Sequence, residues 1–191
     1  MEKQFEIMKL IILDRDGVIN RDSDQFIKSP EEWQPIDGSL DAIAFLTQAG
    51  YTIAVATNQS GIARGYFTVE TLNEMHGKMH RLVQQAGGEI SGVWFCPHMA
   101  DSHCSCRKPE PGMILDILAR FNAEASETYL VGDSLRDLQA IARAGGRPVL
   151  VLTGKGKKTL AKEKDRLPEN TLVFDDLLAF SQYLREQDKL A

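Results

Sequence analysis

Long apolar runs and an excess of positive charge are both missing from this sequence. The run Leu10–Leu13 is far shorter than the ~20 apolar residues that a transmembrane helix needs, and the formal net charge is -5. The residues before that run include Glu2, Lys3 and Glu6, which is not typical of a secretory signal peptide. Neither a membrane span nor a basic nucleic-acid surface is therefore expected. We expect a cytoplasmic protein that binds anionic ligands through a local positive site.

Internal repeats, long linkers and an apolar stripe on the surface are also lacking. The 191 residues are enough for one α/β domain with a complete core. We therefore expect a single domain over residues 1–191, and a monomer, because the pattern indicates neither a second core nor a surface for self-association.

Cysteine is scarce and confined to one segment. The three cysteines, Cys96, Cys104 and Cys106, lie close together beside His98 and His103. An odd, clustered set in a cytosolic chain favours metal ligation over disulfides. Three thiols and one imidazole suit a closed, structural zinc site, and the Cys-Pro-His spacing favours His98 as the fourth ligand. The alternative is three metal-free thiols on an exposed loop.

Apolar runs alternate with helical patterns along the chain. Strands are expected near residues 8–13, 51–56, 90–95, 128–131, 148–152 and 171–174, and helices over 38–49, 68–86, 111–121, 135–144 and 177–186. This alternation predicts a doubly wound, three-layer α/β sandwich with a mainly parallel sheet. The Gly- and Lys-rich stretch 154–158 is expected to be a solvated loop, because no Ser or Thr completes a phosphate-binding motif there.

Side chains suited to phosphate chemistry stand near the ends of four expected strands. They are Asp14 and Asp16 at the first, Thr57 and Asn58 at the second, Lys108 near the third and Asp133 at the fourth. The carboxyl ends of parallel strands share one edge, where ligands bind. Clustered carboxylates need a cation, and oxygen ligands suit Mg²⁺. A carboxylate can also be the nucleophile in phosphoryl transfer, although any one of these acids alone could be a helix cap or turn former.

Four segments together resemble the motifs of the haloacid dehalogenase superfamily of phosphatases. The segments are Leu13–Val18, Thr57-Asn58, Lys108 and Gly132-Asp133, in that family's order. The resemblance implies that Asp14 is the nucleophile and that Asp16 is the general acid and then the base that activates water. It also implies that Thr57 and Lys108 stabilise the transferring phosphoryl group. Asp14, the backbone carbonyl of Asp16, and Asp133 would bind Mg²⁺.

Three further polar residues are expected to have no part in this chemistry. Asp137 lies four residues after Asp133 and could support the metal, but a solvated helix face is favoured. His76 and His80 lie one turn apart on an expected helix. No third ligand accompanies them, so an ordinary helix surface is expected.

The cysteine segment narrows the resemblance to a small branch of the superfamily that lacks a large cap domain. That branch contains phosphatases for histidinol phosphate and for the C7 phosphate of D-glycero-D-manno-heptose 1,7-bisphosphate. Residues 58–68 and 109–113 look like the sugar bisphosphate enzymes, whereas the short zinc loop, 96–106, and Ser134 depart from some of them. The resemblance favours the sugar bisphosphate. Histidinol phosphate, or a catalytically inactive binding module stabilised by zinc, are the alternatives.

A sugar bisphosphate carries a second phosphate away from the reacting one. Arg107 is expected to bind it, because a guanidinium group matches phosphate geometry, and Arg64 could help or merely cover its loop. Asp22 and Ser23 could contact sugar hydroxyls or simply form a polar turn. The full expected substrate-binding set is Asp22, Ser23, Asn58, Gln59, Ser60 and Arg107.

Overall fold

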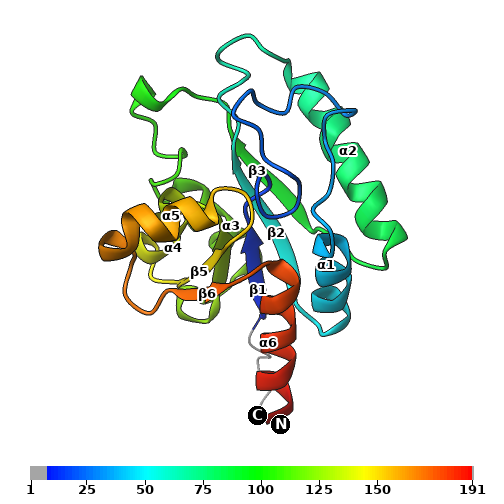
Figure 1. The fold of residues 1–191 in the computed structure, drawn as a ribbon, viewed down its shortest axis with the longest axis vertical. Helices are drawn as coiled ribbons and strands as arrows, with labels where there is room; N and C mark the ends of the chain where they lie inside the picture. The colour runs from blue at the N-terminus through cyan, green and yellow to red at the C-terminus, as the bar shows by residue number, and fades with distance from the viewer. Residues whose placement is uncertain (1–7, 191) are drawn as a thin grey trace.

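A six-stranded sheet lies at the centre of the computed structural model, which describes residues 8–190 (Figure 1). The strands are β1 (Leu10–Leu13), β2 (Thr52–Asn58), β3 (Gly92–Cys96), β4 (Tyr129–Gly132), β5 (Arg147–Val151) and β6 (Leu172–Phe174). The α-helices are α1 (Ser39–Gln48), α2 (Val69–Gln85), α3 (Gly112–Phe121), α4 (Leu135–Arg143), α5 (Gly156–Glu163) and α6 (Leu177–Leu190). The charged residues Glu2, Lys3 and Glu6 lie outside the described part.

The strands are arranged in the order β3-β2-β1-β4-β5-β6, and every neighbouring pair is parallel. The chain runs outward from β1 to β3 and then returns to the other side of β1 as β4. Leu13 is therefore paired with Val55 on one side and Val131 on the other. This reversal of strand order leaves a crevice beyond the carboxyl ends of β1 and β4, where doubly wound proteins bind ligands. The predicted doubly wound fold is confirmed.

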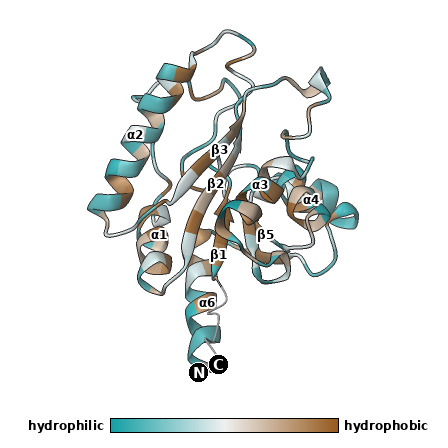
Figure 2. Cartoon of the chain, turned by 180° about the vertical axis from the view of Figure 1, so that it is seen from behind, coloured by the Kyte–Doolittle hydropathy of each residue, from teal (hydrophilic) through white to brown (hydrophobic). Residues whose placement is uncertain are grey.

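Helices cover both faces of the sheet, which explains why β1 is apolar throughout. Ile11 and Leu13 belong to a core cluster shared with α1, α2 and α6, whereas Leu10 and Ile12 belong to a second cluster shared with α3 and α4. Figure 1 shows α1 and α2 on one side of the strands and α3 and α4 on the other. In Figure 2 the strands are largely brown, and the exposed sides of the helices are largely teal. The core is thus the two layers between sheet and helices.

Two long connections at the carboxyl end of the sheet carry no inserted domain within residues 8–190. The connection 14–38 contains only turns and isolated bridges, and 59–68 contains only turns. The first is anchored by Trp33, which is fully buried, while Lys78 of α2 donates hydrogen bonds to the carbonyls of Pro30 and Trp33, both at 2.7 Å. The expected absence of a large cap is confirmed. Among residues 8–190, no helix is both long and apolar enough to cross a membrane.

Two local predictions differ from the structure. β2 continues through Asn58, so Thr57 belongs to the strand itself and its position is set by pairing with β3. The stretch 154–158 is not a free loop, because α5 begins at Gly156 and the residues before it pack against Asp133. A composition rich in Lys and Gly cannot report such a contact, since the contact is made across the sheet.

Candidate active site

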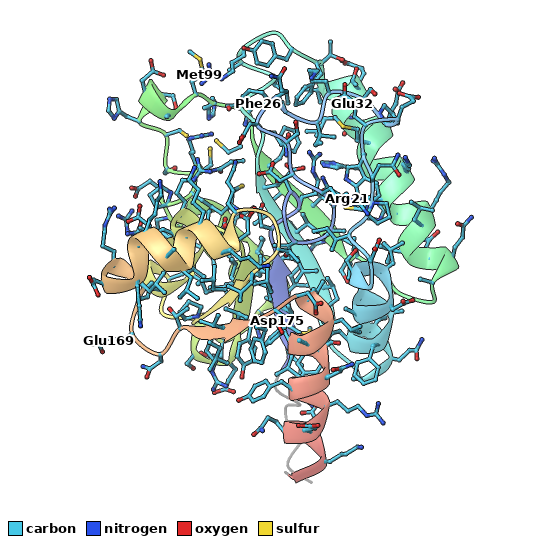
Figure 3. The ribbon with its side chains drawn as sticks, in the orientation of Figure 1. Arg21, Phe26, Glu32, Met99, Glu169 and Asp175 are labelled. Carbon is cyan, nitrogen blue, oxygen red and sulfur yellow. The ribbon has the colours of Figure 1, made fainter. Side chains whose placement is uncertain are left out.

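A pocket of about 270 Å³ lies at the carboxyl end of the sheet. Asp14 and Asp16 enter it after β1, Thr57 enters from β2, and Lys108 and Asp133 enter from the segments that follow β3 and β4. The predicted set of catalytic residues is therefore brought together in one place. Figure 3 shows this end of the molecule uppermost, with Phe26 and Met99 on its loops and with Glu169 and Asp175 lower down.

Three carboxylates form the floor of the pocket. Asp14, Asp133 and Asp137 each offer an oxygen within 4.8 Å of the others. Asp137 was expected on a solvated helix face, but it is only 1% exposed, and Ser134 donates to it through both its backbone N–H (3.1 Å) and its hydroxyl (2.6 Å). The prediction for Asp137 was wrong because the docking of α4 against β4 and β5 turns this side chain inward.

Lys108 lies between two of these acids, Asp14 and Asp137. Its Nζ is 2.9 Å from Asp14 Oδ1 and 2.6 Å from Asp137 Oδ1, and it donates to the Ala56 carbonyl at 2.6 Å. The Lys108 side chain is 1% exposed. Burial alone would lower the pKa of Lys108, but the Asp137 and Asp14 carboxylates raise it above its usual value. Lys108 is therefore charged and held by three acceptors.

Asn58 positions the backbone of Lys108 rather than presenting a free amide to the pocket. Its side-chain oxygen accepts from Lys108 N at 3.1 Å, and its side-chain nitrogen donates to the Lys108 carbonyl at 3.0 Å. Two hydrogen bonds between β2 and the segment after β3 thus fix the backbone of Lys108. Asn58 still lines the pocket.

The acid cluster carries more negative charge than Lys108 can balance. Burial raises the pKa of Asp14 to about 7, with Asp137 and Asp16 adding to the effect. Burial and the neighbouring Asp137 and Asp14 likewise raise the pKa of Asp133 to about 8. Three carboxylates facing one ammonium suit a divalent cation with oxygen ligands. The residues present therefore fit magnesium.

Asp16 is held apart from this cluster by donors of its own. Arg15 Nη2 donates to both its oxygens, at 2.9 and 3.0 Å, and Asn20 and Gln59 each donate to one of them at 2.8 Å. Burial by itself would raise the pKa of Asp16, but the Arg15 charge and these hydrogen bonds together place it below its usual value. Gln59 also donates to the Thr57 hydroxyl at 2.9 Å, so one amide links two of the predicted catalytic residues.

His76 also differs from its expected place on the surface of a helix. It is 7% exposed, and its Nε2 lies 3.4 Å from Arg15 Nη1. The apolar spacing of α2 places position 76 beside Leu72 and Met75 on the buried side. A surface position was predicted because only metal pairing was considered for the two histidines.

The segment after β5 supports Asp133 and was missed by the sequence interpretation. Lys155 N donates to Asp133 Oδ2 at 2.8 Å, and the Thr159 hydroxyl donates to the Asp133 carbonyl at 2.8 Å. Gly154 and Gly17 leave room for this carboxylate, because a Cβ on either would overlap Asp133 Oδ2. The strand-end rule that found the other groups applies equally to the end of β5. Applied there, the rule would have pointed to the segment with Gly154 and Lys155.

We expect Gly154→Ala to weaken magnesium binding about 10- to 100-fold, because groups that orient a metal ligand typically affect affinity by this much. A Cβ there would lie 2.2 Å from Asp133 Oδ2 and 2.6 Å from Gly17 Cα. Calorimetric titration with Mg²⁺ measures the change. Gly50→Ala is the matched control, since Gly50 has a similar positive φ, +84° against +53°, but open space around its Cβ position. Equal magnesium affinities in the Gly154→Ala and Gly50→Ala variants would contradict the inference that Gly154 leaves room for the Asp133 carboxylate.

The cysteine segment forms a second, separate cluster. Cys96, His98, Cys104 and Cys106 bring their ligand atoms within 4.8 Å of one another, and His103 is not among them. The Cys106 sulfur lies 3.3 Å from that of Cys96, 3.4 Å from that of Cys104 and 3.4 Å from His98 Nδ1. Zinc–sulfur bonds of about 2.3 Å in a tetrahedron put neighbouring sulfurs about 3.8 Å apart. The donor set and its spacing therefore fit zinc.

Three arginines also line the pocket. Arg64, Arg107 and Arg136 all reach it, and none forms an ion pair with a carboxylate within the described residues. Burial, together with the other two arginines, lowers the pKa of Arg107. Arg107 Nη1 donates to the His98 carbonyl at 3.0 Å, and the Arg64 guanidinium lies 5.8 Å from the centre of the Phe26 ring. These three neighbouring guanidinium groups suit an anion. Arg136 was not predicted.

The remaining predicted substrate residues line the same pocket with different neighbours. Asp22 Oδ2 lies 2.9 Å from Lys155 Nζ, which ties the connection 14–38 to the segment after β5. Asp22 Oδ1 also accepts from Ser23 N at 2.8 Å, as in a polar turn. Ser60 is 7% exposed at the pocket wall. Lys155 is a further positive group that the sequence interpretation left out.

Known proteins resemble this chain over nearly its whole length. The HAD-hydrolase-like family model matches residues 105–180. A Neisseria meningitidis serogroup A protein named D-glycero-beta-D-manno-heptose-1,7-bisphosphate 7-phosphatase is 71% identical over 181 residues, 95% of this chain and 97% of that protein. A Bordetella bronchiseptica protein of the same name is 56% identical over 180 residues, 94% of this chain and 99% of that protein.

Solved structures agree with these relatives. The D,D-heptose 1,7-bisphosphate phosphatase from B. bronchiseptica, complexed with magnesium and phosphate, has a TM-score of 0.91 at 56% identity and covers 94% of this chain. The corresponding phosphatase from Burkholderia thailandensis has a TM-score of 0.74 at 51% identity and covers 93% of this chain. Sequence, fold and the acid cluster around Lys108 thus agree, and the chain belongs to the D-glycero-β-D-manno-heptose-1,7-bisphosphate 7-phosphatase family of HAD-like hydrolases.

Proposed function

We propose that this protein is a magnesium-dependent phosphatase that removes the C7 phosphate from D-glycero-D-manno-heptose 1,7-bisphosphate. The observation that carries the proposal is the placement of two unlike sites in one pocket. Lys108 pairs with Asp14 and Asp137, the Asp133 carboxylate lies close to both of these acids, and three arginines without carboxylate partners among the described residues line the same pocket. The acid cluster with Lys108 suits the reacting phosphate with its metal, and the arginines suit a second phosphate. The family membership supports the same substrate.

Asp14 is proposed as the nucleophile. Its carboxylate oxygen forms a bond to the phosphorus while the bond from phosphorus to the C7 oxygen breaks, and Asp16 gives that oxygen a proton. A water then attacks the aspartyl-phosphate, Asp16 takes a proton from it, and inorganic phosphate leaves with Asp14 restored. The arriving phosphate is itself an anion, and a nearby negative charge favours the protonated form of Asp16. Lys108 and Thr57 neutralise and orient the phosphoryl oxygens.

Magnesium is assigned to Asp14, the backbone carbonyl of Asp16, and Asp133. When bound, it would balance the charge of the carboxylates and of the phosphate oxygens. Zinc is assigned to Cys96, His98, Cys104 and Cys106. Four protein ligands close the zinc coordination sphere, so its proposed role is structural.

The second phosphate is assigned to Arg107, with Arg64 and Arg136 beside it. A guanidinium offers two parallel donors to a phosphate. An anion there would also relieve the mutual repulsion of the three charges. Asp22, Ser23 and Ser60 are proposed to contact the sugar from the adjoining walls of the pocket.

We also place the reaction in the cytoplasm, on a route to lipopolysaccharide or a related heptose-containing glycoconjugate, and propose a monomer. None of the three cysteines is in a disulfide, and all three lie in the cluster proposed to bind zinc. Free, clustered thiols suit a reducing compartment.

Comparing substrates tests the proposed function. With Mg²⁺ present, kcat/KM is measured for both C1 anomers of the heptose 1,7-bisphosphate, for the heptose 7-phosphate and for histidinol phosphate. We expect a preference of about 100-fold for the bisphosphate over the 7-phosphate, the upper scale of a hydrogen bond to a charged group, and Arg107→Ala should remove most of it. Preference for histidinol phosphate would overturn the substrate assignment, and no turnover of any ester would favour an inactive binding module.

Magnesium should stabilise the protein more as the pH rises. The pKa values of Asp14 and Asp133 in the metal-free fold are about 7 and about 8, against a usual 3.8. Between the usual pKa of 3.8 and the raised values of about 7 and about 8, the folded metal-free protein therefore holds more protons than the unfolded chain. Its stability falls as the pH rises through that window. Bound Mg²⁺ replaces those protons. Melting temperatures with and without Mg²⁺ should differ more at about pH 8.5 than at about pH 5.5, and an equal difference at both would contradict this.

Cys104→Ala should affect recognition of the second phosphate more than the chemical step. Arg107 donates to the His98 carbonyl inside the zinc loop, whereas Lys108 Nζ is held by Asp14, Asp137 and the Ala56 carbonyl. We expect the KM for the bisphosphate to rise about tenfold, the scale of one lost charged hydrogen bond, and kcat to change less. Measurement of zinc content and both constants checks this. Loss of kcat alone would instead indicate coupling to Lys108.

A further inference from the structure

Arg15, between the two predicted catalytic acids, is fully buried and does not line the pocket. Its guanidinium faces Asp16 on one side, with Nε at 3.2 Å and Nη2 at 2.9 and 3.0 Å from the carboxylate oxygens. On the other side, Nη1 lies 3.4 Å from Nε2 of His76. Because arginine has no acceptor, His76 must receive this contact through a lone pair and must therefore be neutral.

His76 restricts the orientation of the Arg15 guanidinium. It projects from the middle of α2, on the same buried side as Leu72, Met75 and Met79. The burial of this site and the neighbouring Arg15 charge lower the pKa of His76 to about 3. A buried guanidinium is costly unless its donors are used, and the pairing with Asp16 and His76 uses donors on both sides of the group.

We propose that His76 and Arg15 are positioning residues that fix the Asp16 carboxylate for proton transfer to the leaving oxygen. The inference rests on the proposed acid role of Asp16. His76 touches neither the pocket nor Asp16, so it acts only through Arg15. Asn20 and Gln59 hold the same carboxylate from other directions, but neither belongs to a helix, whereas His76 ties Asp16 to the frame of α2.

The test uses the dependence of rate on the leaving group. The leaving group of the heptose bisphosphate is an alkoxide that needs a proton. The leaving group of p-nitrophenyl phosphate is a stabilised phenolate that does not need one. The quantity measured is kcat/KM, which reports the steps through transfer of the phosphoryl group to Asp14. His76→Leu removes the acceptor, and His76→Gln places an amide oxygen near the position of Nε2. Melting temperatures of both variants report folding.

We expect His76→Leu to lower kcat/KM for the bisphosphate about tenfold, a part of the 10²- to 10⁴-fold that a general acid contributes. The loss of kcat/KM on p-nitrophenyl phosphate should be at least about five times smaller. His76→Gln should restore most of the original ratio of kcat/KM between the two substrates. Arg15→Lys keeps the charge but loses the paired donors, so it should show the same leaving-group pattern. This variant replaces His76→Leu in the test if His76→Leu folds poorly.

Equal losses on both esters would overturn the inference, because a merely structural role does not distinguish leaving groups. Unchanged rates on both in His76→Leu would also overturn it. Asp16→Asn separates this failure from a failure of the proposed function. If Asp16→Asn shows the strong leaving-group dependence and His76→Leu does not, Asp16 is the acid but His76 does not position it. If neither does, the acid role of Asp16 is itself wrong.

Discussion

Replacing Asp14 with asparagine should lower the rate of phosphate release by about 10³-fold or more, because the amide is a poor nucleophile and no covalent intermediate can form. The substitution keeps the size of the side chain, so the fold should persist. Removing one negative charge from the cluster with Asp133 and Asp137 should leave the metal-free protein as stable or more stable, because burial and these neighbours already disfavour the charged form of Asp14. Phosphate release and the melting temperature measure the two effects.

The matched control is Asp165→Asn, an exposed aspartate outside the pocket. It makes the same chemical change and should alter neither quantity. Phosphate release by Asp14→Asn at close to the original rate would mean that another group attacks the phosphorus. A large loss of stability in Asp14→Asn would mean that the carboxylate is charged and fully balanced in the metal-free fold.

Replacing Lys108 with methionine should harm both stability and turnover. Methionine fills a similar space but leaves Asp14 and Asp137 without the ammonium that lies 2.9 and 2.6 Å from them. Removing one partner of a buried ion pair typically costs about 3–5 kcal/mol of unfolding free energy. Loss of a charge aimed at the transferring group should lower turnover by about 10²- to 10³-fold. Denaturant unfolding without Mg²⁺ and steady-state kinetics check the two effects.

A second substitution separates these two consequences. In the Lys108→Met, Asp137→Asn double variant, one unbalanced carboxylate is removed, so part of the lost stability should return while turnover stays low. Such non-additivity is expected for residues in direct contact. Lys9→Met removes a surface ion pair with Asp188 and should change stability little. If the double variant is no more stable than Lys108→Met, the buried Asp137 charge is not the cause.

Much of the candidate site followed from positions along the chain. Asp14, Thr57 and Asp133 stand at the ends of strands that any parallel sheet brings to one edge, and the structure places them in one pocket. Similarly, the close spacing of Cys104 and Cys106 limits their side chains to one small region. These inferences needed only local patterns and the known behaviour of parallel strands.

Other parts required contacts between distant segments. Asp137 and His76 lie beside apolar positions of their helices, but that spacing does not show which partners a polar side chain finds there, and both proved buried. Gly154 and Lys155 were predicted to lie in a solvated stretch, because their partner, Asp133, follows a different strand. Arg136 follows Asp133 by three residues, but its place in the chain does not show that its side chain reaches the pocket.

By itself, the sequence determined the order of the strands and of every helix except α5, the chemistry at the strand ends and the four candidate zinc ligands. Those features depend on local spacing, which a chain carries with it before it folds. Only the tertiary structure decided the support of Asp133 by the segment after β5, the pairing of Lys108 with Asp14 and Asp137, and the contact of Arg15 with His76. The physical reason is that buried polar groups must find partners, and those partners lie across the sheet or on another element, at distances that local sequence does not encode.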